Sequence, residues 1–472
     1  MKENFKLAWR NLWRNRRRTT ITSASILFAV FFALLMRSMQ LGSYDNMIKN
    51  VIEKYSGFIK IQNVNFEDDK SIDNVFEFNS EMINKLRSLD GVKAVVPRIE
   101  SGAFISTGDL TKAVVILGVD AEHEKQLSNP ESMLVRYRID KQCIDKLNLN
   151  KNFPPKLIEK IKSLENNSYS NSKTLNNDLD LNDKEKDYIH DIENAAKFNG
   201  ENLSPGDPGI LVSDRLAKFL KVQIGDSIIL MGQGYHGVTA QGLFPIKGII
   251  KVPAPDLDNK LIYMEISQAE KFFELNNQLT SIAVNLFDNS NDNLTKTRDK
   301  IASLLNNDNL SVEHWKQFNK ILWQQIEGDS QTGQAMLALL YFIIFFGIFG
   351  TVLMMIHERY KEFGVLVSIG MQKIKLSVVI LIEMVYMGII GVSAGIALSL
   401  PLLYLGNRYP IRLTGEMAKT MESVGQEALL PLAWVDMYVL WQAVIVSLMV
   451  VLSCIYPLIK VIRLKEVEAL RS

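Results

Sequence analysis

Hydrophobic residues along the chain gather into four long segments, at about 21–41, 333–356, 376–405 and 437–459. The second and fourth contain no charged residue, and the third contains one, Glu383. A helix needs roughly 20 apolar residues to cross the ~30 Å hydrocarbon core of a membrane, whereas soluble helices rarely lack a polar face over that length. The pattern therefore predicts four transmembrane helices. The first segment is interpreted as an uncleaved anchor, because its apolar core is long for a signal peptide and no small-residue cleavage site follows.

Basic residues flank these segments unevenly, which predicts the orientation of the chain. Lys and Arg near span ends favour the cytoplasmic side, so the segments 1–20, 357–375 and 460–472, with both termini, are expected to be cytoplasmic. The segment 42–332 and the acidic loop 406–436 are then expected outside. The residues that carry this pattern are Lys2, Lys6, Arg10, Arg14, Arg16, Arg17, Arg18, Arg359, Lys361, Lys373, Lys375, Lys460, Arg463, Lys465 and Arg471.

The segment 42–332 has the size of a soluble domain and mixes two periodicities. The runs SGFIKIQ, KAVVPRI, AVVILGV, DSIILM, FPIKGIIKV and LIYMEI are β-branched and bounded by turn residues, which predicts strands. The runs SEMINKLRSL, SDRLAKFLKV and ISQAEKFFEL predict short helices with Ser at the N-cap. We therefore expect an α+β domain inserted between the first two spans.

Both ends of this domain carry apolar residues at helical spacing, which predicts that the first two spans continue beyond the membrane as stalk helices. The first extension is expected to reach about residue 56. Two separate surface helices packed on the domain would produce the same pattern. The residues concerned are Ile48, Val51, Ile52 and Tyr55 after the first span, and Trp315, Phe318, Leu322 and Ile326 before the second.

One region of the domain, about 147–204, has a different composition. It includes LENNSYSNSKTLNNDLDLNDKEKD, which is rich in Asn, Ser, Asp and Lys and poor in large apolar residues. Such a segment buries little surface, so a mobile low-complexity insertion is expected there. A docking element for a partner is the alternative interpretation.

The remaining composition excludes several classes of function. The net charge of +1 gives no reason to expect nucleic acid as a partner, and the two cysteines suggest no disulfide framework. The G-x-G-x-x-G at 232–237 is followed by a strand pattern rather than a helix, so a turn is expected instead of a dinucleotide site. The chain contains no Walker A motif, the five histidines lack metal-ligand spacing, and no nucleophile motif is present. We therefore expect neither an enzyme nor a metal site.

The short segment between spans two and three is mixed in charge and helical in pattern. Phe363, Leu366, Val367 and Gly370 are expected to line one face of a short helix. Its polar end is formed by Glu358, Arg359, Lys361 and Glu362. A helix of this kind at the cytoplasmic surface could dock on a separate protein, or it could simply anchor the loop at the interface.

Within the third span, two features are expected to be structural. An ionisable residue in lipid usually faces protein or water, so Glu383 is expected to pair with a basic residue at the cytoplasmic interface or with backbone groups of a neighbouring span. Gly391 and Gly395 form a G-x-x-x-G motif, which allows close helix contact. That contact could lie within one chain or at the seam of a dimer.

These residues carry a resemblance to a known family. The segment HERYKEFGVLVSIGMQKIKLSVVILIEMVYMGIIGVSAGIALSLPL resembles the permease segment shared by the MacB, FtsX and LolC/LolE families of ABC transporters. The C-terminal run YPLIKVIRLKEVEALRS resembles the family ending, with Lys465-Glu466 where a proline is usual. Outer-domain runs such as GILVSDRLAKFLKVQIGDSIILM are most similar to LolC/LolE. Outside 147–204 the resemblance covers most of the chain. The matching positions are Glu358, Arg359, Glu362, Gly364, Leu366, Gly370 and Glu383.

The resemblance implies an α-helical membrane protein with a MacB-like outer core and an FtsX-like permease domain, multi-pass in the bacterial inner membrane with its large domain in the periplasm. It implies mechanotransmission: a separate cytoplasmic P-loop ATPase dimer binds ATP and Mg, grips the coupling helix and drives the outer domain. No cofactor is then expected in this chain. A second permease copy is implied as well, either identical or related. The implied coupling residues are Glu358, Arg359, Glu362, Phe363, Gly364, Leu366 and Gly370.

The implied task is the release of lipoproteins from the inner membrane to a periplasmic carrier. Phe31, Met36 and Arg37, at the outer half of the first span, would border the path of the lipid chains. A MacB-type efflux permease for drugs or peptides is one alternative, and an FtsX-like signal transmitter that activates cell-wall hydrolases is another.

Overall fold

The computed structural model describes residues 2–14, 16–67, 69–150, 153–413, 415–423 and 426–463. The chain divides into two compact units. The helical unit comprises Met1–Asn46, Trp323–Gly415 and Ala428–Ser472, and the outer unit comprises Met47–Leu322 and Glu416–Glu427. The predicted basic residues Lys465 and Arg471, and the family-ending residue Glu466, lie outside the described residues.

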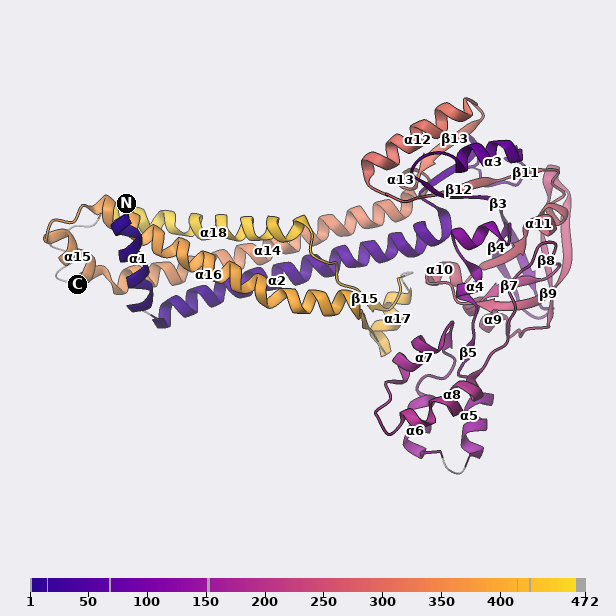
Figure 1. Ribbon diagram of the computed structural model, residues 1–472, viewed down its shortest axis with the longest axis horizontal. Helices are drawn as coiled ribbons and strands as arrows, with labels where there is room; N and C mark the ends of the chain where they lie inside the picture. The colour runs from indigo at the N-terminus through magenta and orange to yellow at the C-terminus, as the bar shows by residue number, and fades with distance from the viewer. Residues whose placement is uncertain are drawn as a thin grey trace. The chain divides into compact units, whose positions relative to one another are not determined.

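The helical unit contains the predicted spans (Figure 1). Four helices are long and apolar enough to cross a membrane: Thr19–Ser56, Lys320–Glu358, Lys373–Arg408 and Met437–Ile462. The prediction of four such helices is thereby confirmed. The elements of this unit and of the loop after its third span are α1 (Lys2–Arg14), α2 (Arg16–Met47), α14 (Lys320–Glu358), α15 (Tyr360–Ser368), α16 (Lys373–Arg408), β14 (Ile411–Arg412), α17 (Gly415–Ser423), β15 (Leu429–Leu430) and α18 (Met437–Ile462).

The first two spanning helices are longer than a membrane requires. The 39 residues of α14 would extend about 58 Å at ~1.5 Å per residue, against the ~30 Å of the hydrocarbon core. The π-helix η1 (Ile48–Ser56) follows α2 directly. The stripe before the second span is interrupted, however, because Asn319 leaves the helical conformation with φ −114° and ψ 56°. Trp315 and Phe318 therefore lie on the separate helix α13, while Leu322 and Ile326 lie on α14.

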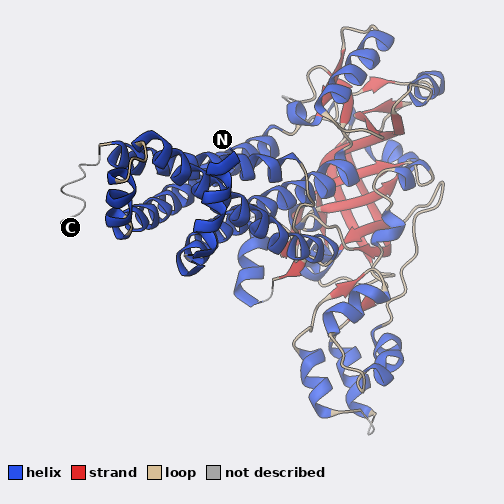
Figure 2. Cartoon of the chain, turned by 60° about the vertical axis from the view of Figure 1, so that its left-hand side comes forward, coloured by secondary structure: helices blue, strands red, loops and turns tan. Residues whose placement is uncertain are grey.

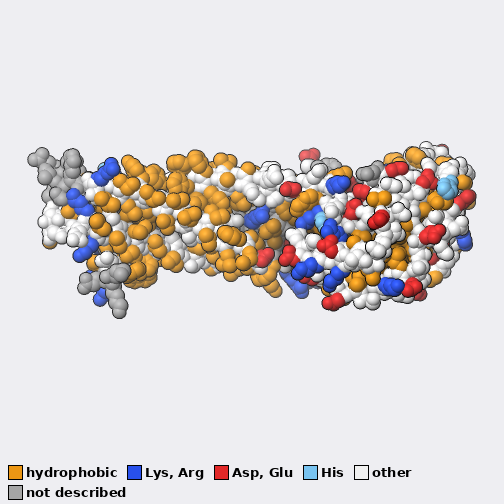
Figure 3. Space-filling model, turned by 90° about the horizontal axis from the view of Figure 1, so that it is seen from above, with side chains coloured by type: hydrophobic (Ala, Val, Ile, Leu, Met, Phe, Trp, Pro, Cys, Tyr) orange, Lys and Arg blue, Asp and Glu red, His pale blue; other side chains and the backbone are white. Residues whose placement is uncertain are grey.

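The core of the helical unit is apolar and continuous across its helices. Helix α16 packs against α18 and α1. Figure 3 shows hydrophobic side chains covering the surface of the spans, with Lys and Arg at their left-hand end. Fully or nearly fully buried members of this core are Ile26, Val30, Leu34, Ile348, Ile380, Met384, Val446 and Val450.

The outer unit is built around a sheet with the strand order β13-β1-β12-β3-β4-β10-β7-β9-β8 (Figure 2). Strand β3 pairs with β12 through its first half, with β8 through Ala103–Ser106, and with β4 from Arg98 to Ser106. The strands β3, β4, β10, β7, β9 and β8 therefore close on themselves. The main strands are β1 (Ile59–Asn63), β3 (Val92–Ser106), β4 (Thr111–Val119), β7 (Ile210–Ser213), β8 (Ser227–Gln233), β9 (Thr239–Ile250), β10 (Leu261–Glu265), β12 (Ser281–Leu286) and β13 (Leu310–His314).

The predicted strand runs all lie in this sheet, and the α+β prediction is confirmed. The G-x-G-x-x-G run connects β8 to β9, which pair antiparallel up to Gln233 and Thr239, so it is a hairpin connection. Shorter strands are β2 (Phe76–Glu77), β5 (Tyr137–Arg138), β6 (Ser168–Tyr169) and β11 (Gln278–Leu279). The helices are α3 (Ser80–Arg87), η2 (His123–Gln126), α4 (Pro130–Met133), α5 (Lys141–Leu149), α6 (Pro155–Lys162), α7 (Ser172–Leu179), η3 (Lys186–Tyr188), α8 (Ile189–Ala196), α9 (Asp214–Leu220), η4 (Tyr235–Gly237), α10 (Pro255–Asp258), α11 (Ile266–Phe273), α12 (Asn291–Leu305) and α13 (Trp315–Phe318).

The predicted serine N-caps are only partly right. Ser213 is the N-cap of α9, although its side chain makes no capping hydrogen bond. Asn79 caps α3 by accepting from the backbone N–H of Met82. Glu265 caps α11 by accepting from the backbone N–H of Ser267. The capping residue thus lies one position before the predicted Ser80 in α3, and two positions before the predicted Ser267 in α11. In each helix its polar side chain satisfies a free N–H group at the helix start.

The region 147–204 differs from the prediction of a low-complexity, mobile insertion. It forms α6, α7 and α8, which pack with α5 around a small core of their own. Leu157 and Ile161 on α6, and Leu175 and Leu179 on α7, are four residues apart and are buried together. A few apolar residues at helical spacing therefore suffice, within an otherwise polar sequence, to form a helical subdomain.

Candidate functional site

The segment between the second and third spans forms a short helix, α15, with a defined end. Gly370 has a φ of +105°, a conformation that favours glycine. Its N–H donates to the carbonyl of Val367 at 2.9 Å, and the N–H of Met371 donates to the carbonyl of Leu366 at 3.0 Å. These two bonds form a Schellman motif, which ends the helix and turns the chain into α16. Gly370 therefore has a structural role in this turn, and its predicted role in coupling stays a prediction.

A buried ion pair joins α15 to α16. Arg359 is the N-cap residue of α15, and its Nη1 lies 2.7 Å from Oε2 of Glu383. The two side chains are only 6% and 3% exposed. The other carboxylate oxygen of Glu383 accepts from Nδ2 of Asn11, on α1, at 2.6 Å. Of the partners expected for Glu383, the structure places the basic one beside it.

The ion pair continues to the surface through Glu362. Nε of Arg359 lies 3.4 Å from Oε2 of Glu362, and Nη2 of Arg14, on α1, lies 2.8 Å from the same oxygen. The guanidinium of Arg359 also lies 5.1 Å from the centroid of the Phe363 ring. We call these residues, namely Asn11, Arg14, Arg359, Glu362 and Glu383, the inner polar network. It ties α1, α15 and α16 together at one end of the helical unit.

Two network members, Asn11 and Arg14, were not identified from the sequence. The signal that could have found Asn11 is its place on α1. Ala8 and Leu12 are buried against the other helices, and Asn11 is three residues after the first and adjacent to the second. A polar residue on the apolar face of an amphipathic helix commonly has a buried partner.

The outward face of α15 differs from the predicted one. Phe363 is only 1% exposed and belongs to the helical core, and Gly364 is buried as well. Val365, Leu366 and Ile369 are 45%, 40% and 80% exposed. The predicted face is therefore divided: Phe363 is covered by the helical core, whereas Leu366, three residues later on the same helix, is exposed. We call Glu362, Val365, Leu366 and Ile369, which follow the i, i+3, i+4, i+7 spacing, the outward face.

The predicted glycines of α16 pack within the chain. A Cβ atom added at Gly391 would lie 2.6 Å from Cβ of Ile26, and one added at Gly395 would lie 2.8 Å from the carbonyl oxygen of Leu27. Both neighbours are on α2. The structure therefore uses the G-x-x-x-G motif for close contact between the first and third spans of one chain.

The residues expected along a lipid path lie near the middle and in the second half of α2. Phe31 is half-buried and stacks edge-on with Phe32, and Met36 is half-buried. Nη1 of Arg37 donates to Oε1 of Gln40 at 2.6 Å, and Nε2 of Gln40 donates to the carbonyl of Asp329 at 3.0 Å. Arg37 is thus held in a polar cluster between the first and second spans.

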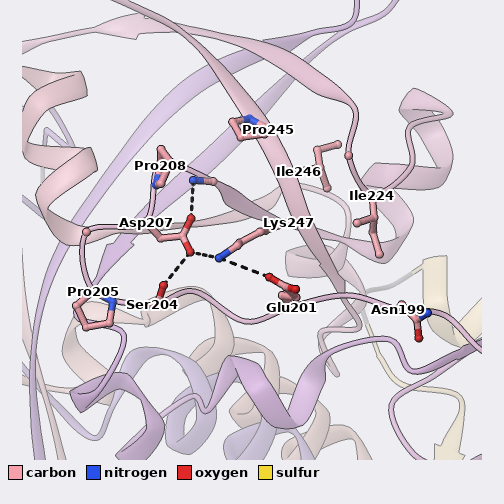
Figure 4. Close-up of a pocket in the computed structure, with 13 residues that line it drawn as sticks. Asn199, Glu201, Ser204, Pro205, Asp207, Pro208, Ile224, Pro245, Ile246 and Lys247 are labelled. Atoms are coloured by element: carbon pink, nitrogen blue, oxygen red, sulfur yellow. Dashed lines mark hydrogen bonds and ion pairs between the residues drawn. The ribbon is translucent and has the colours of Figure 1, made fainter.

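The outer unit contains an open cavity of about 690 Å³ whose charged side chains are paired with one another. Figure 4 shows Lys247 bonded to Asp207 and extended toward Glu201, whose Oε2 is 3.7 Å from Nζ of Lys247. Burial raises the pKa of Asp207, but hydrogen bonds from Lys247, Gly209 and Ser204 outweigh it and hold the pKa below its usual range. No unpaired charge therefore points into this cavity from those side chains. Among the described residues, no group of three or more His, Cys, Asp or Glu is placed to hold a metal ion.

The solved structures that resemble this chain include the outer domains of two transporters. One is the extracellular domain of the ABC-type transporter YknZ from Gram-positive bacteria. Its alignment covers 54% of this chain and 99% of that domain, with 13% sequence identity and a TM-score of 0.29. The other is the periplasmic region of MacB from Actinobacillus actinomycetemcomitans. Its alignment covers 56% of this chain and 91% of that region, with 11% sequence identity and a TM-score of 0.29.

Comparison with known sequences finds similarity in the part of the chain that contains the second to fourth spans. Residues 335–465 match the family model described as FtsX-like permease C-terminal. The lipoprotein-releasing system transmembrane protein LolC of Neisseria meningitidis is 22% identical over 210 residues, which are 43% of this chain and 49% of that protein. LolC of Xylella fastidiosa is 22% identical over 290 residues, 57% of this chain and 66% of that protein. The chain therefore spans about half to two thirds of these relatives. Over residues 335–465 the chain is thus similar to FtsX-like permeases, and over part of its length it is similar to LolC.

Proposed function

We propose that this chain transmits the motion of a separate cytoplasmic ATPase dimer, and thereby releases lipoproteins from the inner membrane to a periplasmic carrier. The observation that carries the proposal is the outward face of α15, which is held on the helical unit by the inner polar network. The chain has no Walker A motif of its own, so the ATPase would be a different subunit.

The outward face has the composition of a docking surface. Exposed Val365, Leu366 and Ile369 form an apolar stripe, with exposed charged residues, Glu358, Lys361 and Glu362, next to it. An apolar patch with a polar rim is typical of a protein interface. We propose that a groove of the ATPase receives this stripe.

The inner polar network would hold α15 rigidly against α1 and α16. A buried, hydrogen-bonded ion pair resists separation, because removing either partner leaves a charge without compensation. A push on α15 would therefore move α1 and α16 with it. Helix α14 is uninterrupted from Lys320 to Glu358, so motion at one of its ends would reach the other.

The docking proposal is tested by copurification of the ATPase with the full-length chain in mild detergent. Ile369→Asp should remove most of the bound ATPase, because it places a charge in the apolar stripe. Ser368→Asp is the matched control, since Ser368 is exposed on the same helix but lies beside the stripe. Glu358→Lys together with Glu362→Lys should also detach the ATPase. If Ile369→Asp copurifies as much ATPase as the unmodified chain, the docking proposal is wrong.

The cargo proposal is supported by similarity to proteins named for lipoprotein release. Depletion of this chain should retain lipoproteins in the inner membrane, as measured by fractionating the two membranes. Normal lipoprotein distribution after depletion would contradict the cargo while leaving the ATPase contact intact. We further propose that both termini are cytoplasmic and that the permease works as a pair, either with an identical copy or with a related subunit.

A further inference from the structure

A cavity of about 270 Å³ lies in the helical unit between α1, α2 and α16, away from the outward face of α15. Its walls are mainly apolar, and the polar and charged side chains gather at one end. The lining residues are Leu12, Trp13, Arg16, Thr19, Thr20, Ser23, Ala24, Leu27, Ile390, Gly391 and Ala394. We call this cavity the inner groove.

The inner groove is hollow because its deeper walls carry small side chains. Ala24 of α2 faces Gly391 and Ala394 of α16, and the two helices touch where Gly391 meets Ile26. The hydroxyl groups nearby are turned to the backbone: Thr19 Oγ1 donates to the carbonyl of Leu12 at 2.9 Å, and Thr20 Oγ1 donates to that of Arg16 at 2.9 Å. These walls therefore favour an apolar occupant.

The length of the inner groove matches one leaflet of a membrane. Its lining on α2 runs from Arg16 to Leu27, a rise of about 16 Å at ~1.5 Å per residue. That is about half of the ~30 Å hydrocarbon core. Trp13, at the end with Arg16, is 56% exposed, as expected for a side chain at a membrane–water interface.

Among the residues that the structure describes, no acidic side chain pairs with the charged end of the inner groove. Arg16 is exposed, its guanidinium lies 5.9 Å from the centroid of the Trp13 ring, and it forms no ion pair with any described residue. Arg17, the next residue, is exposed and likewise has no ion pair within the described ranges. An anion at this end would be attracted by both charges.

We propose that the inner groove binds one anionic phospholipid of the cytoplasmic leaflet, with an acyl chain along Ala24, Leu27 and Ala394 and its phosphate against Arg16. Charge, apolar walls and length each agree with this occupant. The site goes beyond the proposed function, because it requires neither the ATPase nor a lipoprotein. It would also fix α1, whose Leu12 and Trp13 line the groove while Asn11 and Arg14 belong to the inner polar network.

The test uses the full-length chain in mild detergent and native mass spectrometry to count retained lipid. The probes are phosphatidylglycerol, phosphatidylcholine of the same acyl chains, and phosphatidylglycerol with excess inorganic phosphate. We expect one phosphatidylglycerol per chain, retained several-fold more than phosphatidylcholine and not displaced by free phosphate. Arg16→Gln should weaken retention about fivefold, the effect of one basic group near an anionic headgroup. Arg10→Gln, an exposed arginine of α1 outside the lining, is the matched control.

The apolar part of the site is tested by filling it. Ala394→Trp should abolish retention, whereas Ala397→Trp, at an exposed alanine of the same helix, should not. If Ala394→Trp misfolds, the test rests on Arg16→Gln, whose melting temperature should equal that of the unmodified chain. Equal retention of both lipids, or equal retention by Arg16→Gln and Arg10→Gln, would overturn the proposal. Efficient disulfide formation between two chains carrying Thr20→Cys would show a second copy in the groove and would overturn it as well.

Discussion

Arg359 Nη1 lies 2.7 Å from Glu383 Oε2, and this contact neutralises the only acidic residue of α16 inside the helical unit. Both side chains are less than a tenth exposed. Burying an isolated charge in such a place costs several kcal/mol. Each of the two residues compensates the buried charge of the other. The pair also explains why a polar segment between two spans is held against the helices instead of extending as a loop.

Removing one member of this pair should be far more harmful than removing both. Arg359→Met leaves Glu383 charged and buried, and should lower the free energy of unfolding by about 3–5 kcal/mol. The double change Arg359→Met and Glu383→Met should recover most of that loss, since two apolar side chains fill the same space. Unfolding of the full chain by denaturing detergent measures both. Arg14→Met is the control, because Arg14 and Glu362 are 59% and 52% exposed and such a pair contributes about 0–1 kcal/mol. A double variant no more stable than the single one would contradict this account.

The tight contact between the first and third spans predicts opposite effects for two glycines. Gly395→Ala would place a Cβ 2.8 Å from the carbonyl oxygen of Leu27, and we expect a loss of about 1–3 kcal/mol from overpacking. Gly350→Ala on α14 meets nothing within 4 Å and should be neutral or stabilising by up to ~1 kcal/mol, because alanine is the better helix former. The same unfolding measurement compares them. Equal stability of the two variants would show that the α2–α16 contact is looser than described.

The sequence predicts the spans well because their signal is long and unambiguous. Runs such as 437–459 contain no charged residue, and no short-range alternative competes with a membrane helix. The strands are predicted nearly as well, since their β-branched runs are separated by turn residues. Their closure through β3 is not predictable in this way, because it depends on one strand pairing with β12, β4 and β8.

The outward face of α15 could not be chosen from the sequence. In this nine-residue helix, Phe363 and Val367 form one apolar stripe, and Val365, Leu366 and Ile369 form another. Periodicity identifies both stripes but not which one is covered. The contact of Phe363 with Arg359, and the position of Arg359 against Glu383, decide it. Those contacts join residues on different helices, so they require the tertiary structure.

The average composition of the region 147–204 hides a sparse pattern of apolar residues, so it does not predict the helical core found there. Cys143 offers a direct test of the packing of this core. Cys143 on α5 is 1% exposed and lies in the core shared with α6 to α8. Burial, with a further contribution from the charge of Asp140, raises the pKa of its thiol to about 11. A thiol is reactive as the thiolate, so iodoacetamide at pH 8 should label Cys143 very slowly in the folded chain, as measured by mass spectrometry of its peptide.

The comparison for this labelling experiment uses two leucines. Leu157→Asp places a charge in the small core and should expose Cys143 to rapid labelling. Leu149→Asp should leave the rate unchanged, because Leu149 is 82% exposed on the same helix as the cysteine. Rapid labelling of the unmodified chain would mean that these helices do not form a stable core.

Asp258 predicts a pH dependence of the outer unit. It lies at the end of α10, where Oδ1 accepts from the backbone N–H groups of Val252 at 3.0 Å and Asp214 at 3.2 Å. Burial raises the pKa of Asp258 to about 6 from an ordinary value of 3.8; the charge of Asp214 adds to the rise, while Arg215, Lys251 and the hydrogen bond from Val252 oppose it. The folded chain therefore holds a proton at pH 5 that the unfolded chain has released.

A carboxyl group whose pKa is raised on folding contributes stability that is complete below pH ~3.8 and is lost as the pH rises through ~6, a total of about 3 kcal/mol. Asp258→Asn removes this titration but keeps an oxygen for the N–H groups of Val252 and Asp214. Hydrogen exchange at Val252, corrected for the intrinsic pH dependence, should therefore show protection that falls between pH 4 and pH 6 in the unmodified chain and stays level in Asp258→Asn. Asp256→Asn, at an exposed position of the same helix, should retain the fall in protection.

The nearby Asp214 does not confound the measurement between pH 4 and pH 6. Its pKa is lowered, despite its burial, by Lys218 and Arg138, so its contribution to stability changes only below pH ~4. If Asp258→Asn loses protection between pH 4 and pH 6 as the unmodified chain does, another group is responsible and the buried carboxyl is already ionised in the folded state.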